Sequence, residues 1–211
     1  MRKVSSVVLV LCPLIVIAGC SSNPEPAKNA TQATTAPVEK KEAVLYTGKP
    51  CFMRMVDQAR RWTIDAMPIH LESKLNAESV GHDGKATIWT ATFVSPSKGS
   101  SRIFTCSGSV LPQEAAMGVS GSPEMTASTA VPMFDPSLLG VDTDDAFKVA
   151  QEKGGAKLIE KDSKQPIIYA LDWDGKNKQL VWSVVYGSDA KNSKGVGVID
   201  ARTGKFLRAS K

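Results

Sequence analysis

The chain has 211 residues, of which 42% are hydrophobic and 22% are charged, and its formal net charge is +5. This composition supplies one or two small hydrophobic cores but not several membrane spans. Basic residues are scattered among acidic ones, so the sequence lacks the basic patch of a nucleic-acid-binding protein, and we expect no nucleic-acid partner.

The first residues have the pattern of a secretory signal that ends in a cysteine. Two basic residues precede an apolar run over 7–17, which is too short to span a bilayer. The sequence Ile17-Ala18-Gly19-Cys20 resembles the bacterial lipobox. The resemblance implies that residues 1–19 are a lipoprotein signal peptide and that Cys20 is diacylated, so that the lipid (palmitate-type acyl chains) holds the chain on a membrane. A plain export signal or a simple membrane anchor is the alternative.

Residues 20–45 are predicted to form a disordered tether. They are rich in Ser, Thr, Ala and Pro and have neither aromatic residues before Tyr46 nor apolar periodicity, so they cannot offset the entropy of ordering. As a flexible coil the tether would reach about 25–30 Å. Ser21 after Cys20 resembles the outer-membrane sorting signal of enterobacterial lipoproteins. This predicts the periplasmic face of the outer membrane rather than the inner membrane.

A first α+β unit is expected over 46–110. Apolar residues at spacings of three and four predict a helix over 52–66, which Pro68 ends. The pair Asp83-Gly84 predicts a tight hairpin. Strands are expected around 71–80, 86–94 and 102–106.

A second α+β unit is expected over 141–211, after a linker over 111–140 that is rich in Pro, Gly, Ser and Thr. Asp142 or Thr143 can cap a helix over 144–153. Strands are expected over 166–173, 180–186, 195–200 and 205–207. Both halves then read helix, strand, turn, strand, turn, strand, which indicates an internal repeat, although any two helix-plus-meander halves share this order.

Three segments of the C-terminal part carry a resemblance to a known family. They are the helix around 145–150, the strand 181–186 and a C-terminal strand-and-turn motif, Val198-Ile199-Asp200-Ala201-Arg202-Thr203-Gly204-Lys205. Together they resemble the PepSY family. The resemblance implies small α+β modules outside bacterial cells and a role in restraining peptidases, and it brings no catalytic residues. The first half of the chain lacks this C-terminal motif and is interpreted as a diverged copy of the same module. We therefore predict an α+β fold with two helix-plus-antiparallel-sheet units of PepSY-like type packed as a tandem.

Two cysteines remain after the signal and the lipid-attachment position. Cys51 and Cys106 form an even pair in a compartment that permits disulfides, so a disulfide is predicted. Closing a loop of about 54 residues would stabilise the fold by roughly 4 kcal/mol on the chain-entropy model. Two independent buried thiols are the alternative.

No group of residues has the spacing of a catalytic or metal site. His70 and His82 are separated by a predicted strand, and the methionines are scattered, so we expect no metal and no cofactor. The serines lack the flanks of a nucleophile elbow, and a hydrolase would need a Ser or Asp within hydrogen-bond reach of one histidine. Trp89 and Trp182 are expected in the core. We predict that the protein is not an enzyme.

The sequence therefore favours a cell-envelope lipoprotein that acts as a protein-binding or peptidase-inhibitory module. The expected partner is an envelope protein such as a peptidase, docked on a sheet face or edge. The alternative is a small-molecule or cell-wall-ligand binder that uses a cleft between the two units.

Overall fold

The computed structural model describes residues 41–189 and 191–210, which belong to one compact unit. The predicted signal peptide over 1–19, the lipid site Cys20 and the tether up to residue 40 lie outside the described residues. Within the described ranges, no helix is long and apolar enough to cross a membrane.

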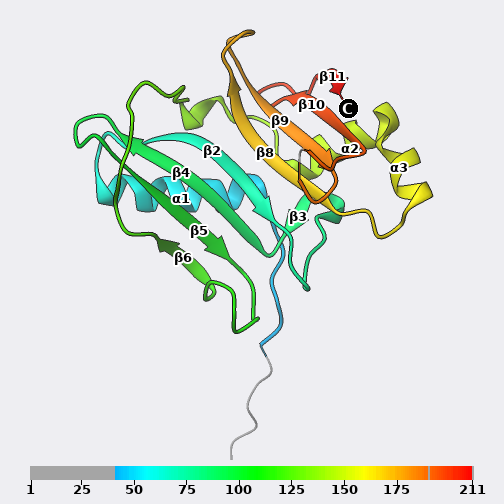
Figure 1. Ribbon diagram of the computed structural model, residues 1–211, viewed down its shortest axis with the longest axis horizontal. Helices are drawn as coiled ribbons and strands as arrows, with labels where there is room; N and C mark the ends of the chain where they lie inside the picture. The colour runs from blue at the N-terminus through cyan, green and yellow to red at the C-terminus, as the bar shows by residue number, and fades with distance from the viewer. Residues whose placement is uncertain (1–40, 190, 211) are drawn as a thin grey trace, which may run out of the picture. The chain divides into compact units, whose positions relative to one another are not determined.

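Nine strands of the described chain build a single antiparallel sheet (Figure 1). Its strands are β2 (Met67–Lys74), β4 (Ile88–Ser95), β5 (Ser100–Ser107), β6 (Gly118–Gly121), β7 (Met125–Thr126), β8 (Ile167–Asp174), β9 (Gln179–Tyr186), β10 (Gly195–Asp200) and β11 (Phe206–Ser210). Their spatial order is β11-β10-β9-β8-β2-β4-β5-β6, and β7 pairs with β5. A separate two-stranded ladder joins β1 (Tyr46–Thr47) to β3 (Lys85–Ala86).

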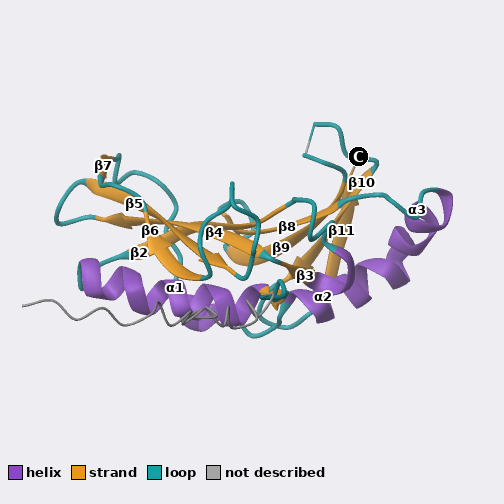
Figure 2. Cartoon of the chain, turned by 90° about the horizontal axis from the view of Figure 1, so that it is seen from below, coloured by secondary structure: helices purple, strands orange, loops and turns teal. Residues whose placement is uncertain are grey.

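The helices cover one face of this sheet. They are α1 (Gly48–Trp62), α2 (Thr143–Ala150) and α3 (Ala156–Lys161), with short turns η1 (His82–Gly84), η2 (Pro136–Leu138) and the π-helical η3 (Gln151–Gly155). Figure 2 shows α1 and α2 along the same side of the sheet, and the opposite face carries no helix of the described chain. That opposite face is called the open face below.

Helix α1 is held by an apolar stripe. Phe52, Met55, Val56 and Ala59 recur at spacings of three and four and are buried against the sheet. The helix begins and ends four residues earlier than the sequence predicts, because its first N–H groups find acceptors near residue 142 and because Thr63 is already extended.

Strand alternation sorts the side chains between the core and the open face. Trp89 and Trp182 are fully buried on the helix side, with their rings edge to face and their centroids 6.5 Å apart, so both are core residues as predicted. Each indole N–H donates to a backbone carbonyl at 2.9 Å. Both rings lie under the first residue of α1, Gly48, where an added Cβ would come within 2.9 Å of one ring and 3.1 Å of the other.

The predicted α+β tandem of two helix-plus-sheet units is wrong. Strand β2 from the first half pairs with β8 from the second, through residues 70–72 and 170–172, so the two sets of strands merge into one antiparallel sheet. The buried side chains form one continuous core from Cys51 to Ala201. The local patterns indicated the strands of each half but not this long-range pairing.

Two further expectations differ from the structure. Asp83-Gly84 does not form a tight hairpin: Asp83 has a φ of 59° within η1, and β2 pairs with β4 across a longer connection that contains β3. The segment over 111–140, expected as a linker, contains β6, β7 and η2, and β6 extends the sheet beside β5.

Candidate functional site: a groove on the open face

A hollow of about 630 Å³ lies on the open face, over β2, β8, β9 and β10. We call it the open-face groove. Its lining residues are His70, Glu72, Ser73, Lys74, Leu75, Ile168, Ala170, Asp172, Ser183, Val185, Ser188, Asp189 and Val196. Alternation places most of these side chains opposite the core residues Leu71, Tyr169 and Trp182.

The groove lies where two strands part. The pairing between β2 and β8 covers three residues of each strand. Beyond it, the N–H of Tyr169 donates to the Ser73 hydroxyl at 3.0 Å, and the N–H of Ile167 donates to the carbonyl of Val80 at 2.9 Å. The next stretch of β2 is therefore not in register with β8, and the surface opens there.

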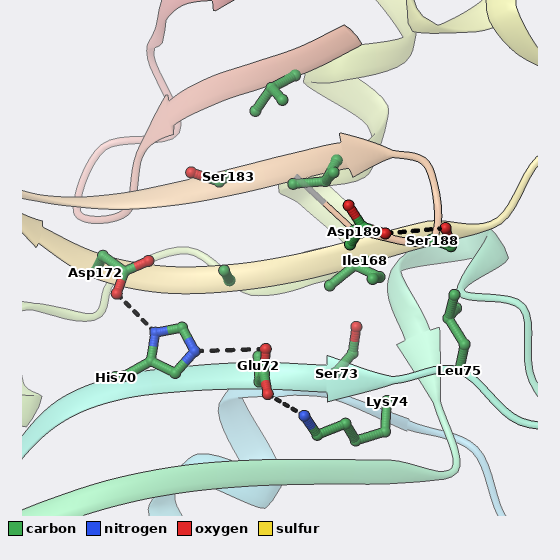
Figure 3. A pocket seen from close by; sticks show the side chains of 13 residues that line it. His70, Glu72, Ser73, Lys74, Leu75, Ile168, Asp172, Ser183, Ser188 and Asp189 are labelled. Atoms are coloured by element: carbon green, nitrogen blue, oxygen red, sulfur yellow. Dashed lines mark hydrogen bonds and ion pairs between the residues drawn. The ribbon is translucent and has the colours of Figure 1, made fainter. Parts of the chain in front are cut away.

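Charged side chains form a row along one wall (Figure 3). Asp172 reaches across from β8 to His70, with 2.7 Å between Oδ1 and Nδ1. The other ring nitrogen of His70 is 3.6 Å from Glu72, and Glu72 is bonded to Lys74. Negative and positive groups therefore alternate along the row, which we call the charge ladder.

The contacts of the ladder favour the ionised forms of His70 and Glu72. The contact with Asp172, and then the contact with Glu72, raise the pKa of His70 to about 9 against the opposing effect of burial. The same His70 contact lowers the pKa of Glu72 to about 2, with a further contribution from Lys74. At neutral pH the groove thus holds an imidazolium between two carboxylates.

Small and aliphatic side chains form the rest of the groove. Ala170 and Ser183 lie side by side on β8 and β9, and their small size leaves room above the sheet. Ile168, Val185 and Val196 surround them. The turn after β9 supplies Ser188 and Asp189 at one end, as Figure 3 shows. An aliphatic floor beside a polar wall is the usual composition of a ligand site.

The predicted disulfide is confirmed. Cys51 on α1 is bonded to Cys106 on β5, and both residues are buried in the core. This bond fixes α1 to the sheet on the face opposite the groove. The predicted lipid attachment at Cys20 lies outside the described residues and stays a prediction.

The two histidines have different surroundings. His82 lies in η1, and its Nε2 is 3.0 Å from the carbonyl of Gln165, which accepts a hydrogen bond there. His70 has an aspartate within hydrogen-bond reach, a contact that the sequence did not indicate. Asp172 therefore meets the requirement stated for a hydrolase, a Ser or Asp within hydrogen-bond reach of a histidine. The side-chain partners of His70 within the described residues are both carboxylates, and neither is a hydroxyl. In the same part of the chain, no group of His, Cys, Asp and Glu is arranged to hold a metal ion.

Sequence reasoning missed Glu72, Lys74, Asp172 and the small residues of the groove. The usable signal was the alternation of His70, Glu72 and Lys74 with the buried Leu71 and Ser73, which marks a polar face of a strand. The partner Asp172 is 102 residues away in sequence, so only the tertiary pairing reveals it.

No protein-family model matches the sequence, and no curated protein matches it. The structure is similar to the crystal structure of a "putative lipoprotein" from Clostridium difficile 630, with a TM-score of 0.50 and 10% sequence identity. The match covers 77% of this chain and 93% of that chain. A likeness at this identity shows a shared fold. The PepSY resemblance of the C-terminal part is not supported by a family model.

Proposed function

We propose that the protein is a lipid-anchored binding protein of the bacterial cell envelope, which holds a partner protein on the open face of its sheet. Cys20 would carry the lipid, and the segment that follows would let the folded unit reach a partner near the membrane. Tethering raises the effective concentration of such a module and compensates for weak affinity. The periplasmic face of the outer membrane is the location that Ser21 favours.

The observation that carries this proposal is the open-face groove itself. A sheet with helices on one face normally needs only polar side chains on the other. Here the open face instead has a hollow of about 630 Å³ with an aliphatic floor and an ionised wall. This volume is within the range of roughly 300–1,000 Å³ that ligand sites occupy. The disulfide and the single core provide a rigid support for it.

A binding role rather than catalysis fits the contacts of His70. A histidine that acts as a general base needs an unprotonated nitrogen beside a nucleophile. The raised pKa of His70 keeps the ring protonated at neutral pH, and its ring nitrogens face Asp172 and Glu72. The function we propose is therefore non-enzymatic, and an envelope protein such as a peptidase is the partner class that we propose.

A small-molecule or cell-wall ligand is the second candidate, because the volume of the groove also suits one. The groove lies at the junction of β2 and β8, where the first and second halves of the chain meet. A small ligand there would contact both halves.

Two matched variants test the groove. Ala170→Leu fills the hollow from a strand position on the open face, whereas Ala116→Leu makes the same change at an exposed position before β6. After cross-linking in intact cells, we expect Ala170→Leu to lose the partner that the wild type and Ala116→Leu recover. Equal recovery by all three chains would show that binding does not use the groove.

A further inference from the structure

The charge ladder indicates what kind of ligand the groove accepts. His70 lies between Asp172 and Glu72, and Lys74 is bonded to Glu72. An anionic ligand would have to break one of these contacts to pair with His70, because both ring nitrogens face a carboxylate. The ladder therefore disfavours an anionic group beside His70 on this wall.

Two polar groups on the β8 and β9 side of the groove are left for a ligand. Asp172 bonds to His70 through one carboxylate oxygen. Within the described residues, its other oxygen and the hydroxyl of Ser183 have no hydrogen-bond partner. Asp189, by contrast, accepts from the backbone of its own turn and from Asn192. On this side of the groove a partner can thus reach one negatively charged acceptor oxygen, that of Asp172, and the hydroxyl of Ser183. Both lie beside the aliphatic floor.

The exposure of the wall favours a segment of a larger partner over an enclosed small molecule. The side chains of His70 and Glu72 are 34% and 32% exposed, and that of Asp172 is 46% exposed. Sites for small ligands usually bury most of the ligand surface. A wall as exposed as this one would leave much of a small ligand in solvent. An extended chain lying along the groove needs no such enclosure, because the rest of the partner covers its outer side.

The charged side chains that line the groove favour a positively charged group on the partner. His70 and Lys74 are opposed by three carboxylates, those of Glu72, Asp172 and Asp189. The groove is therefore slightly acidic, and the free oxygen of Asp172 is the acceptor that a cation on the partner can reach.

We propose that the open-face groove takes an extended peptide segment of a partner protein, with small aliphatic side chains on the floor of Ala170 and Val185 and one basic side chain against Asp172. This inference rests on the proposed function and adds the chemistry of the segment. Burial of aliphatic side chains supplies most of the affinity, and the pair with Asp172 supplies selectivity.

Three capped pentapeptides test the proposal against the full chain in detergent micelles. Their sequences are Val-Ala-Val-Ala-Lys, Val-Ala-Val-Ala-Glu and Ser-Gly-Ser-Gly-Lys. Amide shifts of Ala170 and Ser183 in NMR spectra report occupancy of the groove. We expect the lysine peptide to bind about two- to fivefold more tightly than the glutamate peptide, the range of an exposed ion pair. The Ser-Gly peptide should bind more weakly than either.

Matched carboxylate variants localise the selectivity. Asp172→Asn should reduce the preference for lysine over glutamate to about one. Asp145→Asn, which changes an ion-paired aspartate on α2, should leave the preference unchanged. Unchanged selectivity in Asp172→Asn, shifts outside the groove or no peptide binding would overturn the proposal. If peptides fail while Ala170→Leu still loses the cellular partner, only the peptide class is wrong. If both tests fail, the proposed function fails as well.

Discussion

The carboxylate of Asp142 accepts a hydrogen bond from the backbone N–H of Lys49 at 2.8 Å, although 93 residues separate the two in sequence. The same oxygen accepts from the N–H of Thr143, and the other oxygen accepts from the hydroxyl of Thr47. One side chain therefore caps the N-termini of both α1 and α2 and satisfies donors that a helix leaves free. It joins the two helices over the shared core.

Removing this shared cap should destabilise the protein. We expect Asp142→Ala to lower the free energy of unfolding by about 2 kcal/mol, at the upper end for a single cap because two helices lose an acceptor. Asp142→Asn retains an acceptor oxygen and should recover most of that loss. Urea unfolding followed by circular dichroism measures both. A loss in Asp142→Ala no larger than in Asp145→Ala, which removes an exposed carboxylate from the same helical turn, would contradict the shared cap.

The disulfide should contribute a large part of the stability. Cys51 and Cys106 close a long loop and are both buried, so the double variant Cys51→Ala with Cys106→Ala loses the cross-link without leaving a thiol. We expect a loss of about 4 kcal/mol in the free energy of unfolding, from the entropy that the unfolded chain regains. Chemical denaturation measures this loss. Mass mapping without reduction should recover the two cysteines in one linked peptide, and free thiols there would refute the bond.

The charge ladder makes a defined range of pH important for stability. The folded-state pKa of His70, about 9, exceeds the ordinary value of 6.5, so its contribution is fully present below pH 6.5 and is lost between pH 6.5 and 9. The stability difference between the wild type and His70→Gln should therefore shrink over that range. The pKa of Glu72 is depressed, so its contribution is lost as the pH falls from 4.5 toward 2.

The imidazole of His70 can be titrated directly. Proton NMR of the wild type should give a midpoint near 9, and Asp172→Asn should move the midpoint down toward 6.5, because the largest cause of the shift is removed. A midpoint that does not move in Asp172→Asn would show that the contact at 2.7 Å does not govern the titration.

Lipidation is testable independently of the fold. Cells grown with a fatty-acid analogue should label the wild-type chain and not Cys20→Ala, since the thiol is the predicted attachment point. Membrane fractionation should release the variant from the membrane. Labelling of Cys20→Ala to the wild-type level would contradict attachment at this position.

The elements of the fold could largely be predicted from the sequence. The alternation over 86–94 and 180–186 matches β4 and β9 closely, because large apolar side chains recur at every second position of the sequence. The start of α1 was misplaced, because its first turn contains no apolar stripe and depends on Asp142 for its cap. Tertiary contacts of this kind leave no trace in local periodicity.

The arrangement of the strands and the groove could not be predicted in the same way. Strand patterns specify which face is buried but not which strand lies beside which, so the pairing of β2 with β8 was missed. The contact between His70 and Asp172 follows from that pairing. The disulfide was predictable because the predicted signal and lipid site account for two of the four cysteines, which leaves Cys51 and Cys106 as an even pair.

Site-specific photo-cross-linking in intact cells shows whether a partner protein binds on the open face of the sheet. A photoreactive residue in place of Ser183 lies in the groove, whereas one in place of Asp145 lies on α2, on the helix side of the sheet. Our account predicts that the partner is cross-linked from position 183 and not from position 145. Cross-links to the partner from position 145 alone would place binding on the helix side and contradict the account.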